Sequence, residues 1–221
     1  MLTIPEARRS HPLHLIRRYL YEAVQRHQEV LHGQVLDVGC GRQPYRSLVE
    51  GVGGVYLGYD LPRPGAMAHV LGTASALPFA ENSFDAVLCT EVLEHLPAPQ
   101  DCLREVARVL RPGGHALVTC PWLWGPHEVP YDFYRYTEYG LRYLTERAKL
   151  GVVSIEKTCG ILAALGQRLS AGLHLRLGRG KPPGPLLGLT YATIHFTFDT
   201  LDRWSKHKGE PLGYVLLAVK E

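Results

Sequence analysis

The sequence has few of the features that mark membrane, secreted or disulfide-bonded proteins. No apolar run reaches the ~18–20 residues that a membrane span needs. The N-terminal stretch MLTIPEARRSHPLHL lacks a continuous apolar core followed by a small-residue cleavage site. The five cysteines contain no C-x-x-C pair, which argues against a disulfide framework and against a zinc site. We therefore expect a cytoplasmic protein with buried free cysteines and no transmembrane segment.

Strong charge and several catalytic motifs are also absent. The formal net charge is only +3 over 221 residues, so the composition does not indicate a nucleic-acid partner. The sequence contains no G-x-S-x-G elbow and no G-x-x-x-x-G-K-S/T phosphate loop, and HEVPY, residues 127–131, lacks the second histidine of a metal-binding helix. We therefore expect neither a nucleic acid nor a metal ion as a ligand.

Short strand-like runs alternate with helical patterns between Gln34 and Pro121. An amphipathic helix is predicted before them, over Pro12–Leu31, and the helix over Gln100–Leu110 should end at the proline and glycines that follow it. Because the strand-like runs are apolar on both faces, they predict a parallel sheet covered by helices, an α/β fold. The runs are QVLDV, GVYLGYD, HVLG, DAVLCT and HALVTC.

Beyond Pro121 the alternation becomes looser. WLWGPHEVPYDFYRYT is typical of a long loop, and it is followed by a predicted helix at Glu138–Lys149 and the strands VVSIEKT and GYVLLAVK. The segment between these last strands holds a loop at 178–185 and PLLGLTYATIHFTF, which we interpret as a buried helix. At this length one domain is expected. Its parts are an N-terminal helical extension at 1–33, a core at 34–158, a helical insertion at 159–211 and a closing strand at 212–221.

The stretch VLDVGCGRQPY places the glycine turn Gly39-Cys40-Gly41 after the first strand. Such a turn lets backbone N–H groups face a nucleotide-like ligand, although the signal is weak by itself. Pro44 stands where a dinucleotide fingerprint has its third glycine, which argues against a pyrophosphate cofactor. Asp60, nineteen residues after Gly41, could accept hydrogen bonds from a ribose diol or could simply end its strand in a turn.

Four segments in this order resemble the successive motifs of class I S-adenosylmethionine-dependent methyltransferases. They are VLDVGCGRQPY, YLGYDL, ASALPFAENSFDAVLCTEVLEHL and REVARVLRPGGHALVTCPW, and together they cover about residues 34 to 121. The resemblance implies a Rossmann-like sheet of seven strands with helices on both faces and an antiparallel last strand, for which GYVLLAVK is the candidate. It also implies S-adenosyl-L-methionine as the cofactor.

The resemblance assigns cofactor-binding roles to residues of these motifs. Asp37 and the glycine turn would surround the methionine part, Asp60 the ribose hydroxyls, and Leu61 the adenine. Thr73 stands where the family often has an acidic residue, so adenine recognition would depend on backbone groups nearby. Thr90 and Glu91 would accept hydrogen bonds from the ammonium group of the cofactor. The implied cofactor-binding residues are Asp37, Gly39, Cys40, Gly41, Asp60, Leu61, Thr73, Ala74, Ser75, Thr90 and Glu91.

Two clusters could serve the methyl acceptor. His95, in EVLEHL, is a candidate general base or a brace of the local helix. In HEVPYDFYRYT, His127 and Asp132 are candidates to take a proton. Arg135 could grip an acidic group of the acceptor, with Glu128, Tyr134 and Tyr136 beside it. The alternative is a structural loop in which Arg135 pairs with Asp132 or Glu128 and the aromatic residues fill the core.

These patterns predict an enzyme that transfers a methyl group to a small molecule, at oxygen, by in-line displacement. The 159–211 insertion would form a lid or acceptor pocket that suits a hydrophobic or lipid-linked acceptor, although it could equally be core. A non-catalytic cofactor-binding or scaffold protein is the alternative, supported by Thr73. An NAD-dependent dehydrogenase is favoured only by Gly39, Gly41 and Asp60. The oligomeric state is not predicted.

Overall fold

The computed structural model describes residues 8–178, 181–206 and 209–221. Contacts within the chain divide it into two compact units. A helical unit comprises the described parts of Met1–Glu22 and Lys157–Gly213, and a sheet unit comprises Ala23–Glu156 and Tyr214–Glu221. The N-terminal segment therefore packs with the insertion that precedes the last strand.

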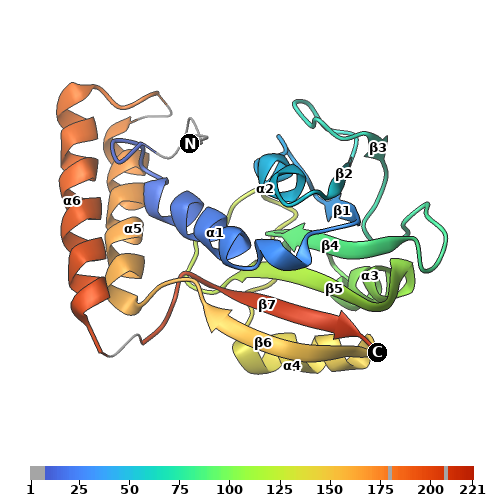
Figure 1. Ribbon diagram of the computed structural model, residues 1–221. Helices are drawn as coiled ribbons and strands as arrows, with labels where there is room; N and C mark the ends of the chain where they lie inside the picture. The colour runs from blue at the N-terminus through green and yellow to red at the C-terminus, as the bar shows by residue number, and fades with distance from the viewer. Residues whose placement is uncertain (1–7, 179–180, 207–208) are drawn as a thin grey trace. The chain divides into compact units, whose positions relative to one another are not determined.

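The sheet unit is built on a seven-stranded sheet of order β3-β2-β1-β4-β5-β7-β6 (Figure 1). The pairs β1–β2, β1–β4, β2–β3 and β4–β5 are parallel, and β7 runs antiparallel to its neighbours. This confirms the predicted Rossmann-like α/β fold. The strands are β1 Gln34–Val38, β2 Val55–Asp60, β3 Val70–Leu71, β4 Phe84–Thr90, β5 Leu110–Pro121, β6 Leu150–Lys157 and β7 Gly213–Lys220.

Two of the helices begin at residues that the sequence marks. Pro99 occupies the first turn of α3, where its missing N–H is not needed, and the Thr137 side chain caps α4 by accepting from the Gly140 N–H at 3.0 Å. The helices are α1 His14–Arg26, η1 Gln28–Val30, α2 Arg46–Gly51, η2 Leu93–His95, α3 Pro99–Val109, α4 Glu138–Arg147, α5 Ile161–Leu173, η3 His174–Gly178 and α6 Pro185–Trp204.

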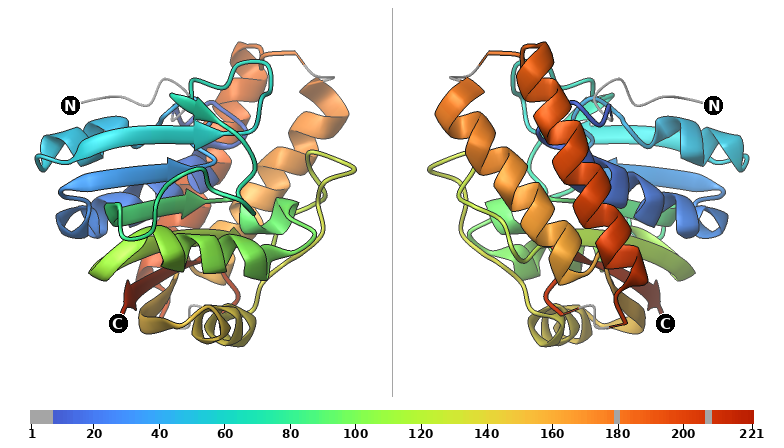
Figure 2. Two further views of the ribbon diagram at one scale, coloured as in Figure 1. Left: turned by 90° about the vertical axis from the view of Figure 1, so that its right-hand side faces the viewer. Right: turned by 90° about the vertical axis from the view of Figure 1, so that its left-hand side faces the viewer.

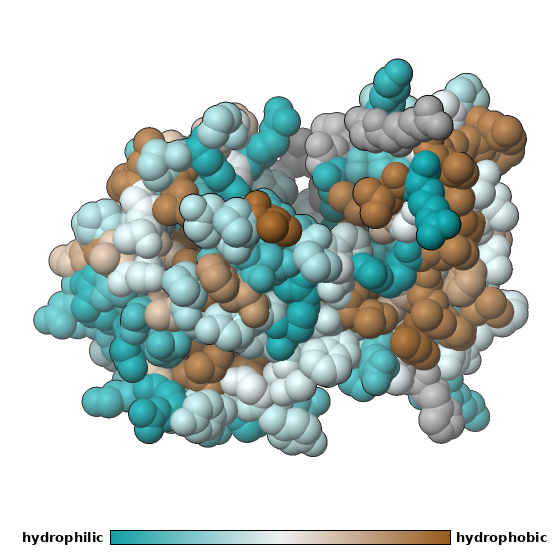
Figure 3. Space-filling model, turned by 180° about the vertical axis from the view of Figure 1, so that it is seen from behind, coloured by the Kyte–Doolittle hydropathy of each residue, from teal (hydrophilic) through white to brown (hydrophobic). Residues whose placement is uncertain are grey.

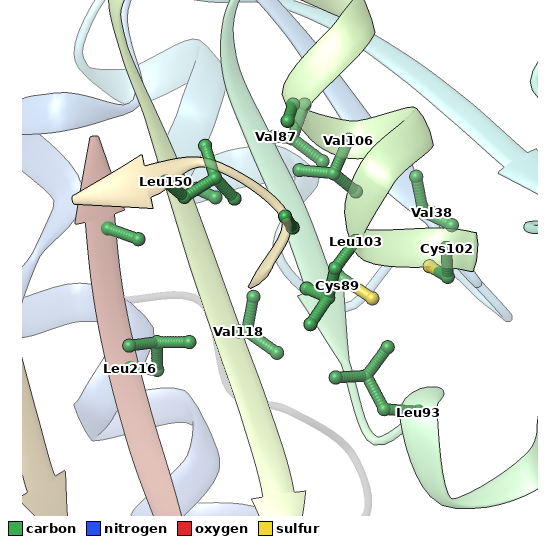
Figure 4. Packing of buried hydrophobic residues seen from close by; sticks show 14 of the residues in the cluster. Val38, Val87, Cys89, Leu93, Cys102, Leu103, Val106, Val118, Leu150 and Leu216 are labelled. Carbon is green, nitrogen blue, oxygen red and sulfur yellow. The ribbon is translucent and has the colours of Figure 1, made fainter. Parts of the chain in front are cut away.

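Both faces of the central strands are covered, which explains why these strands are mostly apolar. On one face, Leu103 and Val106 of α3 belong to a buried cluster with Val87 and Val118 of the central strands (Figure 4). On the opposite face, alternate residues such as Leu88 are also fully buried. The carboxyl ends of β1, β2 and β4 are thereby held together at one edge, where ligands of such sheets bind.

The helical unit consists of the first part of α1 together with α5, η3 and α6. The helices α5 and α6 run side by side (Figure 2), and Gly166 allows the close approach because a Cβ there would press on Phe198. Arg18 of α1 forms an ion pair with Asp199 of α6, and the Tyr19 hydroxyl donates to the same carboxylate at 2.5 Å. These polar contacts fix α1 against α6 inside the unit.

Hydrophobic side chains gather on the surface of this helical unit (Figure 3). The predicted buried helix within α6 is buried on one face only: Tyr191 is fully buried, whereas Leu186 is 80% exposed. The loop expected at 178–185 ends at Pro185, the first residue of α6, and its residues 179–180 lie outside the described part. In the part of the chain that the structure describes, no helix combines the length and apolarity of a membrane span.

Candidate active site

The glycine turn leaves β1 with two residues in left-handed backbone conformation. Gly39 has φ +75° and Gly41 has φ +52°. The N–H groups of Gly39 and Cys40 both donate to the carbonyl of Tyr59 in β2, at 2.8 and 3.1 Å. A Cβ on Gly39 would collide with Val92, whereas the space at Gly41 is open. Glycine is therefore needed at Gly39 both for its backbone conformation and for the close approach of the segment after β4.

Asp60, the last residue of β2, is fixed by the turn that follows β1. One carboxylate oxygen accepts from the Gly41 N–H at 2.8 Å and lies 3.2 Å from Arg63 Nη2, and the other accepts from the Leu61 N–H at 2.7 Å. Its side chain is 4% exposed. Since each carboxylate oxygen has two lone pairs, acceptor capacity remains on Oδ1 for a ligand hydroxyl.

A cavity opens at this edge of the sheet unit. Its volume is about 100 Å³, and it is lined by Val38, Gly39, Tyr59, Asp60, Leu61, Arg63, Gly72, Ala74, Glu91, Val92, His95, Leu96 and Glu128. Nucleotide-sized ligands generally occupy pockets of ≈ 300–1,000 Å³. The volume of this cavity lies below that range. Arg63 and Glu128, two partly exposed side chains that line this cavity, form an ion pair at 3.3 Å.

The cavity brings together many of the residues predicted to bind the cofactor. Gly39, Asp60, Leu61, Ala74 and Glu91 line it, and His95 and Glu128 of the predicted acceptor site join them. The remaining predicted cofactor residues do not line it: Asp37, Cys40, Gly41, Thr73, Ser75 and Thr90. Six further residues line the cavity but were not predicted as site residues: Val38, Tyr59, Arg63, Gly72, Val92 and Leu96. Val92 and Leu96 lie within the quoted EVLEHL motif, whereas Arg63 lies in a loop with no recognisable signal.

Asp37 is completely buried behind the glycine turn. Its Oδ2 accepts from the Tyr56 hydroxyl at 2.5 Å, while Oδ1 has no hydrogen-bond partner among the described residues. Burial raises the pKa of Asp37 to about 7, although the Tyr56 hydrogen bond acts in the opposite direction. An orphaned buried oxygen of this kind favours a nearby positive charge or donor.

Glu91 is held in an uncommon backbone conformation at the end of β4. Its φ is +53°, and its N–H donates to Thr119, to the carbonyl at 3.1 Å and to the hydroxyl at 3.2 Å. The Thr119 hydroxyl in turn donates to Glu91 Oε1 at 3.0 Å. Burial raises the pKa of the Glu91 carboxyl to about 7. A left-handed non-glycine residue that lines a cavity is typical of a functional site.

The 127–137 loop has the structural arrangement that the sequence analysis left as its alternative. All five N–H groups of Arg135 are used inside the protein: two bind Asp132 at 2.7 and 2.8 Å, and the others bind carbonyls of residues 124, 125 and 134. Arg135 thus has no free donor for an acceptor molecule. Its guanidinium also holds the pKa of Asp132 well below the usual range, which makes Asp132 a poor general base. Both residues brace the loop.

The two tyrosines of this loop have different surroundings. Tyr136 is 5% exposed, and its hydroxyl donates to the Leu93 carbonyl at 2.8 Å, so its ring packs in the core and does not face the cavity. Tyr134 is 41% exposed and donates to the Pro97 carbonyl at 3.0 Å. The structure therefore leaves Tyr134, but not Tyr136, available for contact with an acceptor.

The two candidate catalytic histidines lie beside each other. The rings of His95 and His127 are 4.7 Å apart between centroids and meet edge to face. His95 Nδ1 lies 2.6 Å from the Tyr131 carbonyl. Between them is the carboxylate of Glu94, which is fully buried and which the sequence analysis did not single out.

Known proteins resemble this chain in sequence and in fold. Residues 36–118 match the model of a methyltransferase domain family. This part of the chain thus resembles a methyltransferase domain, and S-adenosylmethionine is the cofactor that the resemblance implies. The residues present fit that cofactor, because the carboxylates of Asp60 and Glu91, which line the cavity, are acceptors suited to hydroxyl and ammonium groups.

Curated relatives include enzymes of one name from several bacteria. A ubiquinone biosynthesis O-methyltransferase of Vibrio vulnificus is 35% identical over 119 residues, and the match covers 47% of this chain and 51% of that protein. The enzyme of the same name from Ralstonia nicotianae is 28% identical over 200 residues, covering 84% of this chain and 81% of that protein. The chain thus spans about half the length of the Vibrio relative it matches.

Solved structures share the fold over most of the chain. A S-adenosylmethionine-dependent methyltransferase from Mesorhizobium loti has a TM-score of 0.61 at 16% identity, covering 93% of this chain and 100% of that chain. The cyclase SpnF has a TM-score of 0.56 at 18% identity, covering 93% and 92%. At such identities the likeness shows the fold alone, and the cyclase illustrates that one fold serves different reactions.

Proposed function

We propose that this chain transfers a methyl group from S-adenosylmethionine to an oxygen atom of a small-molecule acceptor by in-line displacement. The observation that carries the proposal is the cavity in which the acceptor groups of Asp60 and Glu91 share a wall with the imidazole of His95. The name of the curated relatives, ubiquinone biosynthesis O-methyltransferase, supports oxygen as the nucleophile.

The residues of the cavity would act mainly by positioning. When bound, the cofactor supplies a methyl carbon already activated by its positive sulfur. Asp60 would accept from the ribose hydroxyls and Glu91 from the ammonium group, so that the methyl group points to a fixed place. Such positioning can contribute on the order of 7–11 kcal/mol to lowering the barrier.

His95 would hold or remove the proton of the acceptor hydroxyl. The Tyr131 carbonyl at 2.6 Å favours the tautomer with the proton on Nδ1, which leaves a lone pair on Nε2. That lone pair can hold or take the proton of a hydroxyl nucleophile, an effect of typically ~10²–10⁴-fold when the base is well placed. We extend the proposal to a hydrophobic or lipid-linked acceptor, which the name of the curated relatives supports.

Calorimetry followed by methyl transfer tests the proposal. We expect S-adenosylmethionine and its demethylated product to bind with 1:1 stoichiometry. Labelled methyl should then pass from the cofactor to members of a panel of phenols that differ in alkyl-chain length, with transfer to oxygen identified by mass spectrometry. Cofactor binding without transfer to any phenol, alcohol, amine or carbon acid would favour the non-catalytic alternative, and absence of cofactor binding would refute both.

A further inference from the structure

Three potential metal ligands converge beside the cavity in the sheet unit. Glu94 and His95 are neighbours in η2, and His127 lies in the loop after β5. One ligand atom from each of these residues lies within 4.8 Å of the others. Glu94 Oε1 is 3.7 Å from His95 Nε2 and 4.0 Å from His127 Nε2. These three residues match no standard metal motif. No metal ion was expected from the sequence because it has no C-x-x-C pair and because HEVPY lacks a second histidine.

Both imidazoles are oriented by acceptors at the nitrogen that faces away from Glu94. His95 Nδ1 lies 2.6 Å from the Tyr131 carbonyl. His127 Nδ1 lies 3.3 Å from the Gly125 carbonyl and 3.4 Å from Asp132 Oδ2. A carbonyl or carboxylate behind the imidazole is the usual support of a metal-binding histidine, because it keeps the proton on Nδ1 and the lone pair on Nε2.

The carboxylate between the two rings lacks a hydrogen-bond donor. Glu94 is completely buried, and neither Oε1 nor Oε2 has a hydrogen-bond partner among the described residues. With the proton of each imidazole on Nδ1, two lone pairs and a carboxylate oxygen face one another. A buried charge without a partner is costly, and a cation placed between these atoms would compensate all three.

The surroundings provide little alternative compensation. Arg135 is the nearest cationic side chain, and its Nη2 lies 3.5 Å from His127 Nδ1, but its N–H groups are committed to Asp132 and to backbone carbonyls. Glu91 and Asp132 add further negative charge near Glu94. In its ionised form Glu94, which burial disfavours, adds a negative charge that a divalent ion would compensate.

We propose that Glu94, His95 and His127 bind a divalent transition-metal ion through one carboxylate oxygen and two Nε2 atoms. Two histidines and one carboxylate with open positions match the ligand set of catalytic zinc and non-haem iron(II) sites. Bond lengths of about 2.0–2.1 Å imply ligand atoms about 3.3 Å apart in a tetrahedral site, so the cluster needs only a modest contraction.

The ion would take part in the proposed methyl transfer, and this role depends on that proposed function. With the ion bound, the His95 Nε2 lone pair is a ligand and no longer accepts a proton, so the ion replaces His95 in activating the acceptor hydroxyl. His95 lines the cavity, so an open coordination position beside it could bind the acceptor oxygen. A divalent ion lowers the pKa of a bound hydroxyl group. The acceptor proton would leave to water, the oxygen would form the new C–O bond as the methyl C–S bond breaks, and the cofactor would leave as a neutral thioether.

Cobalt(II) titration of the full chain, freed of metal and of any affinity tag, tests the site without using activity. We expect one equivalent of cobalt(II) to bind, with visible absorption bands typical of nitrogen and oxygen ligands. Glu94→Gln and His127→Asn should each weaken binding by at least about tenfold. The control is His32→Asn, which changes an exposed histidine of the same unit and should leave binding unchanged.

Two results would overturn the metal site: no stoichiometric cobalt(II) binding by the native chain, or equal binding by the native chain and His127→Asn. If Glu94→Gln fails to fold, as judged by thermal unfolding, His127→Asn still decides, because its side chain is 30% exposed and lies in a loop. Calorimetry with S-adenosylmethionine in the presence of chelator separates the two proposals. Retained cofactor binding with no metal binding refutes the metal site alone.

Discussion

Replacing Asp60 by asparagine would remove one negative charge from the cavity while keeping the shape of the side chain. The carboxylate accepts from the N–H groups of Gly41 and Leu61, at 2.8 and 2.7 Å, and pairs with Arg63. An asparagine amide can face only one of these N–H groups with its oxygen, and its NH₂ group would meet the other donor. The lone pairs that should bind the ribose diol are lost or misdirected.

The expected loss follows from the chemistry of the hydrogen bonds. A hydrogen bond to a charged group contributes about 1.5–3 kcal/mol. Loss of one such bond to a ribose hydroxyl should weaken S-adenosylmethionine binding by about 10- to 100-fold, since each 1.4 kcal/mol is tenfold. Isothermal titration calorimetry of the native chain and Asp60→Asn at one pH and salt concentration measures this ratio.

Asp85→Asn is the matched control. Asp85 also accepts a backbone N–H, from Gln34 at 2.7 Å, and also pairs with an arginine, Arg111, at 2.6 Å, but it lies at the opposite end of the strands. Its replacement should change stability in a similar way and leave cofactor affinity unchanged. Affinity of Asp60→Asn within twofold of the native chain, or an equal loss in Asp85→Asn, would refute the assignment of Asp60 to the ribose.

Three further predictions concern pH, the loop and the core. Burial raises the pKa of Glu91 to about 7, so its carboxyl group ionises as pH rises through about 7. The cofactor, through its ammonium group, should therefore bind more tightly at higher pH. Calorimetry at several pH values measures this dependence, which Glu91→Gln should reduce. Arg135→Lys removes a two-pronged pairing with Asp132 and several hydrogen bonds to carbonyls, so the free energy of unfolding measured in urea should fall by about 1–3 kcal/mol. The control is Arg104→Lys, which changes an exposed ion pair and should alter this free energy little. Leu103→Ala empties a fully buried position and should cost about 2–5 kcal/mol of unfolding free energy, measured against exposed Leu165→Ala as the control.

The sheet could be predicted because its signals are local and repeated. The runs QVLDV and GYVLLAVK coincide with β1 and β7, since strands buried on both faces are mostly apolar. The glycine turn was recognisable for a similar reason: Gly39 has a left-handed backbone and no room for a Cβ. The sequence predicts an element best where one residue type alone satisfies the geometry.

The polar side chains of the site could not be assigned in this way. The sequence around Arg135 is compatible with two roles, binding of an acceptor and bracing of its own loop. Only the folded structure shows that Asp132 and backbone carbonyls accept from all of its N–H groups. Tyr136 could equally have faced the cavity. Glu94 could not be recognised from the sequence, because its role depends on the proximity of His127, which lies in the loop after β5.

The raised pKa values at this edge of the sheet connect stability to ligand binding. Burial raises the pKa of Asp37 and of Glu91 to about 7, and that of Glu94 well above its usual range. Each of these carboxyl groups has a folded pKa above its unfolded value, so stability should fall as pH rises from about 4 to beyond 7, where the buried groups must ionise.

A cofactor with a sulfonium and an ammonium group opposes this loss, because it compensates the ionised carboxylates. We therefore expect S-adenosylmethionine to raise the thermal midpoint more at pH 8 than at pH 6 for equal ligand excess. An equal rise at both values would show that the cofactor does not bind beside these carboxyl groups.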